Sequence, residues 1–172
     1  MALTYELIQN ITGSGNPYVV PSSGNVVNVT FSDIPSTYTD LMVYVSARSS
    51  SAAAEGTYIS FNGSTSDFTG TYLISQGDSG GGTGNIPRYI GSVFGGGNAN
   101  AFNATKLYIS GYTTNQSKTF VLVNAAEMNL GFSYVNMIGG RWLNSSVINS
   151  ITISSTGFTQ NSSFSLYGIK KA

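Results

Sequence analysis

The sequence contains neither cysteine nor histidine, and these two absences remove most of the familiar catalytic arrangements. Without cysteine there are no disulfide bonds and no thiol chemistry. Without histidine the Ser–His and Cys–His nucleophilic pairs and most zinc sites are excluded. The catalytic option that remains is carboxylate-only chemistry, of which glycoside hydrolysis is the usual case. We therefore expect a protein that is not an enzyme and that holds no cofactor.

Charged residues are also scarce. They make up 8% of the chain, with seven basic and seven acidic side chains, whereas about 25% is usual in soluble proteins. A nucleic-acid-binding protein normally carries a basic patch, but the only adjacent basic pair here is Lys170-Lys171. We therefore expect no nucleic-acid partner. Low charge suits a surface that is covered in an assembly, because charges are depleted from interface cores, although turn-rich all-β proteins can have the same composition.

Long apolar runs are missing as well. No run approaches the ~20 residues of a membrane-spanning helix. The N-terminal stretch MALTYELIQN has no basic segment, and Thr4, Glu6 and Gln9 interrupt its apolar residues, so it does not resemble a signal peptide. We expect a chain that is made and folds in a cytoplasm, without membrane contact. Its 172 residues correspond to one domain, residues 1–172.

The clearest structural signal is the stretch Asp33–Ser49, DIPSTYTDLMVYVSARS. Ile34-Pro35 favours an extended backbone followed by a turn, and from Thr39 the side chains alternate as in a β-strand. One face is apolar and is predicted to lie in the core: Leu41, Val43, Val45 and Ala47. The other face is amphiphilic and is a candidate subunit contact: Met42, Tyr44, Ser46 and Arg48.

Similar short strands are predicted along the rest of the chain, with no helix. They cover Thr4–Ile11, Asn25–Phe31, Tyr58–Phe61, Thr71–Ser75, Ile86–Phe94, Ala101–Ser110, Lys118–Ala125, Phe132–Leu143, Val147–Ser154 and Ser163–Ile169. This pattern predicts an all-β fold, a two-sheet antiparallel β-sandwich of jelly-roll type in a single domain.

Four local features carry more specific predictions. Asn62-Gly63 is a strong two-residue hairpin signal. The glycine-rich segment Gly77–Asn85 is predicted to be a flexible loop. Lys118–Ala125 is apolar on both faces, as in a strand buried on both sides. Gly139-Gly140 indicates a bulge or bend within its strand.

No residue is assigned a catalytic, cofactor-binding or metal-binding role. The glycine clusters lack the Gly-Lys-Ser/Thr of a phosphate loop, and Asp67 and Asp78 lack the dense spacing of a calcium site. No two acids stand at a spacing that forces them together on one strand face: Glu6, Asp33, Asp40, Glu55, Asp67, Asp78 and Glu127. Trp142, the only tryptophan, could stack on a sugar but is more typical of a core or an interface. Candidate interface residues are therefore Met42, Tyr44 and Trp142.

Five segments, kept in order over nearly the whole chain, carry a resemblance to a known group of proteins. They are YELIQN at 5–10, FSDIPSTYTDLMVYVSARS at 31–49, ISFNGS at 59–64, RWLNSSVINSITISS at 141–155 and FSLYGI at 164–169. Together they resemble small uncharacterised virion structural proteins of tailed bacteriophages, common in aquatic phages and similar to capsid decoration or cement proteins.

This resemblance implies a non-enzymatic virion component without catalytic residues to carry over. The expected function is a capsid decoration protein, a homotrimeric β-sandwich on the outside of the head that bridges and stabilises major capsid subunits. The alternative is a tail-fibre or baseplate module that binds host-surface carbohydrate, which would need an exposed cluster of aromatics and amides. A carboxylate-based glycosidase would need two facing acids at roughly 5 Å or 6.5–9.5 Å.

Overall fold

The computed structural model describes residues 3–12, 26–76, 79–85, 87–96, 100–127 and 133–171. These residues form twelve β-strands and no helix, which confirms the all-β prediction. The strands are β1 Leu3–Thr12, β2 Val26–Phe31, β3 Asp40–Ala47, β4 Ala54–Phe61, β5 Phe68–Gln76, β6 Ser79–Asn85, β7 Tyr89–Phe94, β8 Asn103–Ser110, β9 Lys118–Glu127, β10 Ser133–Trp142, β11 Ile151–Phe158 and β12 Ser163–Lys171.

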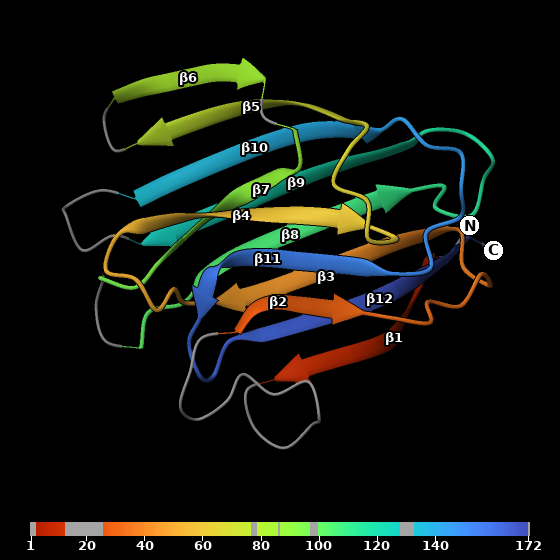
Figure 1. Ribbon diagram of the computed structural model, residues 1–172, viewed down its shortest axis with the longest axis horizontal. Coiled ribbons are helices and arrows are strands. Elements are labelled where there is room, and N and C mark those ends of the chain that lie inside the picture. The colour runs from red at the N-terminus through yellow and green to blue at the C-terminus, as the bar shows by residue number, and fades with distance from the viewer. Residues whose placement is uncertain are drawn as a thin grey trace.

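The strands form two antiparallel sheets that pack face to face, as the sequence predicted. The large sheet has eight strands in the order β1-β12-β3-β8-β9-β10-β5-β6, and the small sheet has four in the order β2-β11-β4-β7. Figure 1 shows the two layers overlying one another, with β5 and β6 lying beyond β7 at the top of the view. The small sheet therefore covers only one face of the large sheet.

The strand order is that of a jelly roll with two inserted hairpins. With β5, β6, β9 and β10 set aside, the remaining strands can be lettered B to I in chain order. The sheets then read B-I-D-G (β1-β12-β3-β8) and C-H-E-F (β2-β11-β4-β7), the arrangement of an eight-stranded jelly roll. The β5–β6 and β9–β10 hairpins extend the large sheet past β8.

The core lies between the two sheets, and β3 contributes the face that the alternation predicted. Its core-facing residues Leu41, Val43, Val45 and Ala47 are at most 5% exposed. Farther along the sandwich, Trp142 packs edge-on against Phe61 at 5.5 Å and stacks with Phe68 at 6.2 Å between ring centroids. Burying a large aromatic side chain contributes on the order of 2–3 kcal/mol, so this cluster is a major part of the core.

A buried amide network fastens β7 of the small sheet to β9 of the large one. The carboxamide of Asn124 donates hydrogen bonds to the carbonyl of Ser92 at 3.1 Å and to the hydroxyl of Thr105 at 2.9 Å. Its Oδ1 accepts from the Ser92 N–H at 3.0 Å and from Asn136 Nδ2 at 2.8 Å. These bonds satisfy backbone groups of β7 that its own sheet leaves free, because β7 is an edge strand.

The turn predicted at Asn62-Gly63 forms, but the predicted hairpin does not. Both residues have positive φ, 53° and 73°, as a type I′ turn requires, and the Ser64 N–H donates to the Phe61 carbonyl at 2.9 Å. However, β4 belongs to the small sheet and β5 to the large sheet. The chain changes sheets here because β5 pairs with β10 instead of returning along β4.

The prediction of a flexible loop at Gly77–Asn85 is wrong for the part that the structure describes. Ser79–Asn85 forms β6, an edge strand paired with β5, while Gly77 and Asp78 lie outside the described residues. Backbone pairing needs no side chains, which is why a glycine-rich segment can form a ladder. At Gly84 the missing side chain is required, because a Cβ there would lie 2.5 Å from the ring of Tyr72.

The bulge predicted at Gly139-Gly140 is also absent. β10 pairs in unbroken register with both neighbours, so that Gly140 lies opposite Phe120 on β9 and Gly70 on β5. Packing, and not backbone conformation, requires glycine at position 140, because a Cβ there would lie 2.1 Å from the Phe120 ring. Gly139 has no such neighbour.

Two strand ends also differ from the predicted pattern. β11 begins at Ile151, and residues 147–150 precede it without strand pairing. Alternation along the predicted strand Asn25–Phe31 puts Val27 on the same side as Val29 and Phe31, which are buried, but Val27 is 47% exposed. It lies near the start of β2, where the β2–β11 register shifts and the small sheet ends.

Candidate binding surface

The outer face of the large sheet, turned away from the small sheet, is the main candidate for a functional surface. The prediction that β9 is buried on both faces is wrong: Phe120 and Leu122 are 4% and 1% exposed, but Val121 and Val123 are 48% and 46% exposed. The reason is the two-layer architecture, in which the second sheet covers one face only. The apolar residues on the other face of β9 therefore meet solvent.

These valines belong to an apolar ridge that crosses three strands. Val123, Met137 and Leu73 lie directly opposite one another on β9, β10 and β5. The ridge consists of side chains that are 46–54% exposed: Leu73, Val121, Val123, Val135 and Met137. Five half-exposed large side chains amount to a patch on the order of a few hundred Å², the size at which exposed apolar surface marks an interaction site.

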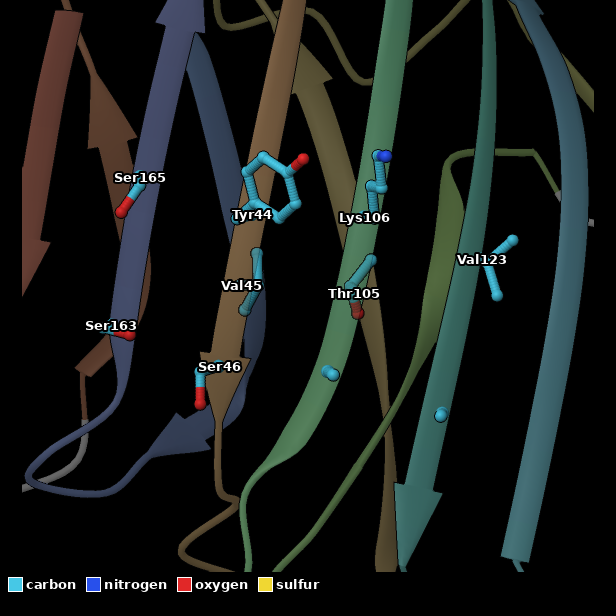
Figure 2. A pocket seen from close by; sticks show the side chains of 10 residues that line it. Tyr44, Val45, Ser46, Thr105, Lys106, Val123, Ser163 and Ser165 are labelled. Carbon is cyan, nitrogen blue, oxygen red and sulfur yellow. The ribbon is translucent and has the colours of Figure 1, made fainter. Parts of the chain in front are cut away.

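A shallow hollow of about 510 Å³ lies beside the ridge, over β12, β3, β8 and β9. Figure 2 shows Tyr44 on β3, Lys106 on β8 and Val123 on β9 around it, with Ser46 toward one end. The lysine ammonium lies 5.7 Å from the centre of the Tyr44 ring, a cation–π distance. Much of its lining consists of small side chains, Ser46, Ala104, Ala125, Ser163 and Ser165, so the hollow can receive a side chain from another molecule.

The structure places only one of the three candidate interface residues on this surface. Tyr44 is 42% exposed and packs edge-on against Tyr167 at 5.7 Å. Met42 is on the same face but only 5% exposed. Trp142 is 1% exposed and lies in the core, so it is neither a contact residue nor a sugar platform in this conformation. Tyr44 remains the candidate contact.

Three of the acidic residues that the structure describes have structural positions. Asp40 is buried and accepts hydrogen bonds from the Tyr108 hydroxyl at 2.7 Å and from the Gly111 N–H at 2.8 Å. Asp33 and Asp67 occupy turn positions with φ of 53° and 65°. Among the residues that the structure describes, no three or more His, Cys, Asp or Glu side chains gather where they could hold a metal ion.

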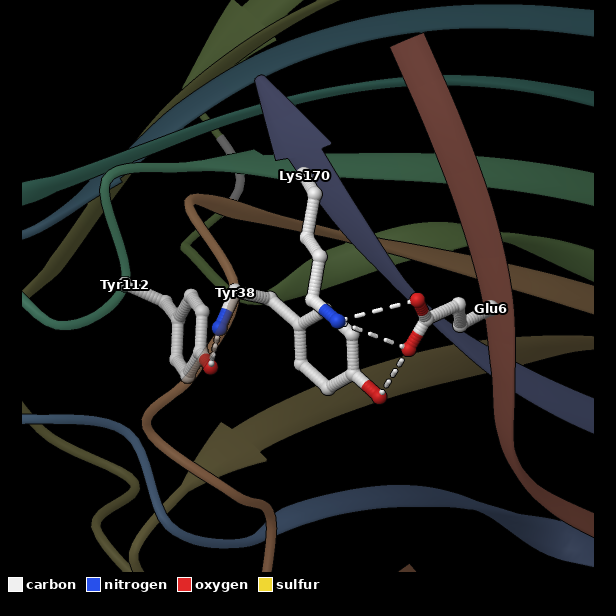
Figure 3. A network of polar contacts seen from close by, with 4 residues as sticks. All are labelled: Glu6, Tyr38, Tyr112 and Lys170. Atoms are coloured by element: carbon white, nitrogen blue, oxygen red, sulfur yellow. Dashed lines mark hydrogen bonds and ion pairs between the residues drawn. The ribbon is translucent and has the colours of Figure 1, made fainter. Parts of the chain in front are cut away.

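Glu6 takes part in a charged network with Lys170 and Tyr38 (Figure 3). Lys170 donates to both of its oxygens, at 2.9 and 3.1 Å, and the Tyr38 hydroxyl donates at 3.0 Å. The hydrogen bond from Lys170 holds the pKa of Glu6 below its usual value and raises the pKa of Lys170. The Tyr38 N–H donates to the hydroxyl oxygen of Tyr112 at 3.3 Å. This network joins β1 and β12 to the turn before β3, so its role is structural.

The fold and this surface together define a class: a jelly-roll β-sandwich with an exposed apolar face on its larger sheet. No family model, no curated protein and no solved structure matches the chain. Within the described part of the chain, no helix is long and apolar enough to span a membrane.

Proposed function

We propose that the protein is a non-enzymatic structural component of a tailed-phage virion, a decoration protein that stabilises the outside of the head as a homotrimer. The observation that carries this proposal is the apolar ridge on the outer face of the large sheet. Exposing an apolar face of this kind to water is unfavourable for a free monomer. Such a face is explained if a large partner covers it. The ordered resemblance of five segments to phage virion proteins indicates what that partner is, the major capsid protein.

The proposed mechanism of stabilisation is multivalent bridging. A symmetric trimer presents three copies of the same surface. When each copy contacts a different capsid subunit, the second and third contacts form at a high effective concentration, so modest single contacts give tight overall binding. Three bridged subunits then resist separation. The low charge of the chain, 8%, fits a surface of which much is covered in the particle.

The test is immunogold labelling of intact particles with an antibody to this chain. Dense, even gold over the head supports the proposal, and light scattering of the purified chain should give three times the mass of one chain. Gold confined to the tail would favour the alternative, a tail-fibre or baseplate module for host carbohydrate. Particles without gold would refute both placements.

A matched pair of variants tests the surface. Met137→Asp places a charge on the ridge and should reduce the amount of protein retained on heads. Val147→Asp is the control, because Val147 is 41% exposed but precedes β11 and lies off the ridge. Equal retention of the two variants would show that the ridge is not the docking surface.

A further inference from the structure

Gly139 lacks an internal reason to be glycine. A Cβ at this position would meet no heavy atom within 4 Å, and its φ is not in the left-handed region, whereas a Cβ on the next residue, Gly140, would collide with Phe120 at 2.1 Å. A glycine within a central strand weakens the strand, and it often marks a place where a ligand or another chain approaches closely. Close approach of another molecule to this part of the strand would therefore explain the glycine at position 139.

The missing side chain opens a cleft of about 470 Å³ on the outer face, across β10, β5 and β6. Arg141 stands at one side, two residues along β10 from Gly139 and opposite Thr69 on β5. Thr71 and Asn85 continue across the sheet from Gly139. Successive strands are about 4.8 Å apart, so the cleft spans roughly 10 Å from its arginine strand to β6.

The guanidinium of Arg141 has no acidic partner among the described residues. The cleft itself is lined without any carboxylate. On β5, β8, β9 and β10, the strands of the ridge and the cleft and their neighbour, the exposed charged side chains that the structure describes are Lys106 and Arg141, both cations. A second copy of the same face would therefore bring cations toward cations, and the charge favours a different, acidic partner.

The remaining polar groups fit a carboxylate that becomes buried. A carboxylate has about four acceptor positions, of which a bidentate arginine fills two. A buried charge is tolerated only when its remaining positions are also satisfied. The hydroxyls of Thr69 and Thr71 are available for this purpose, and Asn85, whose Oδ1 accepts from the Gly70 N–H at 3.5 Å, keeps its amide hydrogens.

We propose that the cleft over Gly139 receives an aspartate or glutamate side chain of the protein to which this chain docks, with Arg141 as its ion-pair partner. This inference rests on the proposed function, in which that protein is the major capsid protein. The apolar ridge adjoins the cleft, since Val121 lies opposite Gly139. Arginine is enriched among binding hot spots, and neighbouring contacts that exclude water strengthen them.

The experiment adds purified chain back to phage heads that lack it and measures bound protein against concentration. Arg141→Gln should weaken binding about tenfold or more, since a hydrogen bond to a charged group contributes roughly 1.5–3 kcal/mol. Gly139→Val, which fills the cleft, should weaken binding at least as much. Lys170→Gln is the matched control for loss of one cation, because this lysine is 47% exposed and lines neither the hollow nor the cleft. It should bind within about twofold of the native chain.

Folding of the Gly139→Val variant is checked by its thermal midpoint, which should not fall, because the added side chain points into open space. The wild-type affinity should decrease with added salt, and Arg141→Gln should lose most of that salt dependence. If the native chain binds heads and both variants bind equally well, the inference is wrong while the proposed function stands. If the native chain does not bind heads, the proposed function fails. If a soluble polyuronate displaces the chain, the cleft is a glycan site and the inference is overturned.

Discussion

Replacement of Asn124 by alanine should be among the most destabilising single changes in the sandwich. The side chain is 1% exposed and joins the edge strand β7 to β9 through hydrogen bonds with Ser92, Thr105 and Asn136. Its removal leaves at least the Ser92 N–H and the Asn136 amide buried without their partner. An unsatisfied buried polar group costs about 1–3 kcal/mol, so we expect a loss of about 3–5 kcal/mol in the free energy of unfolding.

Urea denaturation measures this loss as a lower midpoint with an unchanged slope. Val123→Thr is the control on the same strand, because Val123 is 46% exposed on the outer face, and it should change stability by less than about 0.5 kcal/mol. A double-mutant cycle with Asn136→Ala should give a coupling of about 0.5–3 kcal/mol. If Asn124→Ala costs less than about 1 kcal/mol, the network does not hold the two sheets together and the reasoning fails.

Three further predictions concern glycines and one buried lysine. Gly140→Ala should lower the free energy of unfolding by about 1–3 kcal/mol through overpacking against Phe120, whereas Gly139→Ala should leave it unchanged or raise it. Thermal unfolding of the two variants measures this difference. Equal changes in both variants would contradict the packing argument. Gly63→Ala should lower the free energy of unfolding by about 1–2 kcal/mol, because the φ of Gly63 is 73°. A urea midpoint equal to that of the native chain would refute this prediction. Lys118 is buried, and desolvation lowers its pKa, so the unfolded chain holds this proton at higher pH than the folded one. The stability of the native chain relative to Lys118→Met should therefore increase as pH rises through the lowered folded pKa toward the ordinary value of 10.5, and a flat difference between the two urea titrations would exclude this.

Side-chain alternation was a reliable guide wherever one face of a strand is buried. It identified Leu41, Val43, Val45 and Ala47 as core, and the structure confirms all four. It also predicted the two-sheet sandwich, because many short strands without a helix have few other ways to bury their apolar faces. The same reasoning misjudged β9, since a strand with two apolar faces can be buried on both sides or can present one side to a partner. The local pattern is identical in the two cases.

The candidate surface was only partly predictable. Tyr44 was identified from its amphiphilic strand face and is exposed, but the apolar ridge and the cleft at Gly139 were not foreseen. The ridge joins residues from β5, β9 and β10 that are up to 64 positions apart, Leu73 to Met137. Nothing in the local sequence shows that these strands are neighbours. The position of Trp142 was not predictable either, because a tryptophan is equally suited to a core and to an interface. Only its place in the sandwich shows that it belongs to the core.

The sequence by itself determined most of the strands, the alternation on β3, the positive-φ turn at Asn62-Gly63 and the absence of histidine and cysteine chemistry, because these depend on local sterics and on composition. Tertiary structure decided which strands are neighbours, which face the small sheet covers, and why two adjacent glycines differ. Gly140 lies under Phe120, and Gly139 opens onto solvent. The physical reason is that burial and cleft formation depend on which side chains meet across strands, and strand order in a sheet is a non-local property that neighbouring residues do not encode.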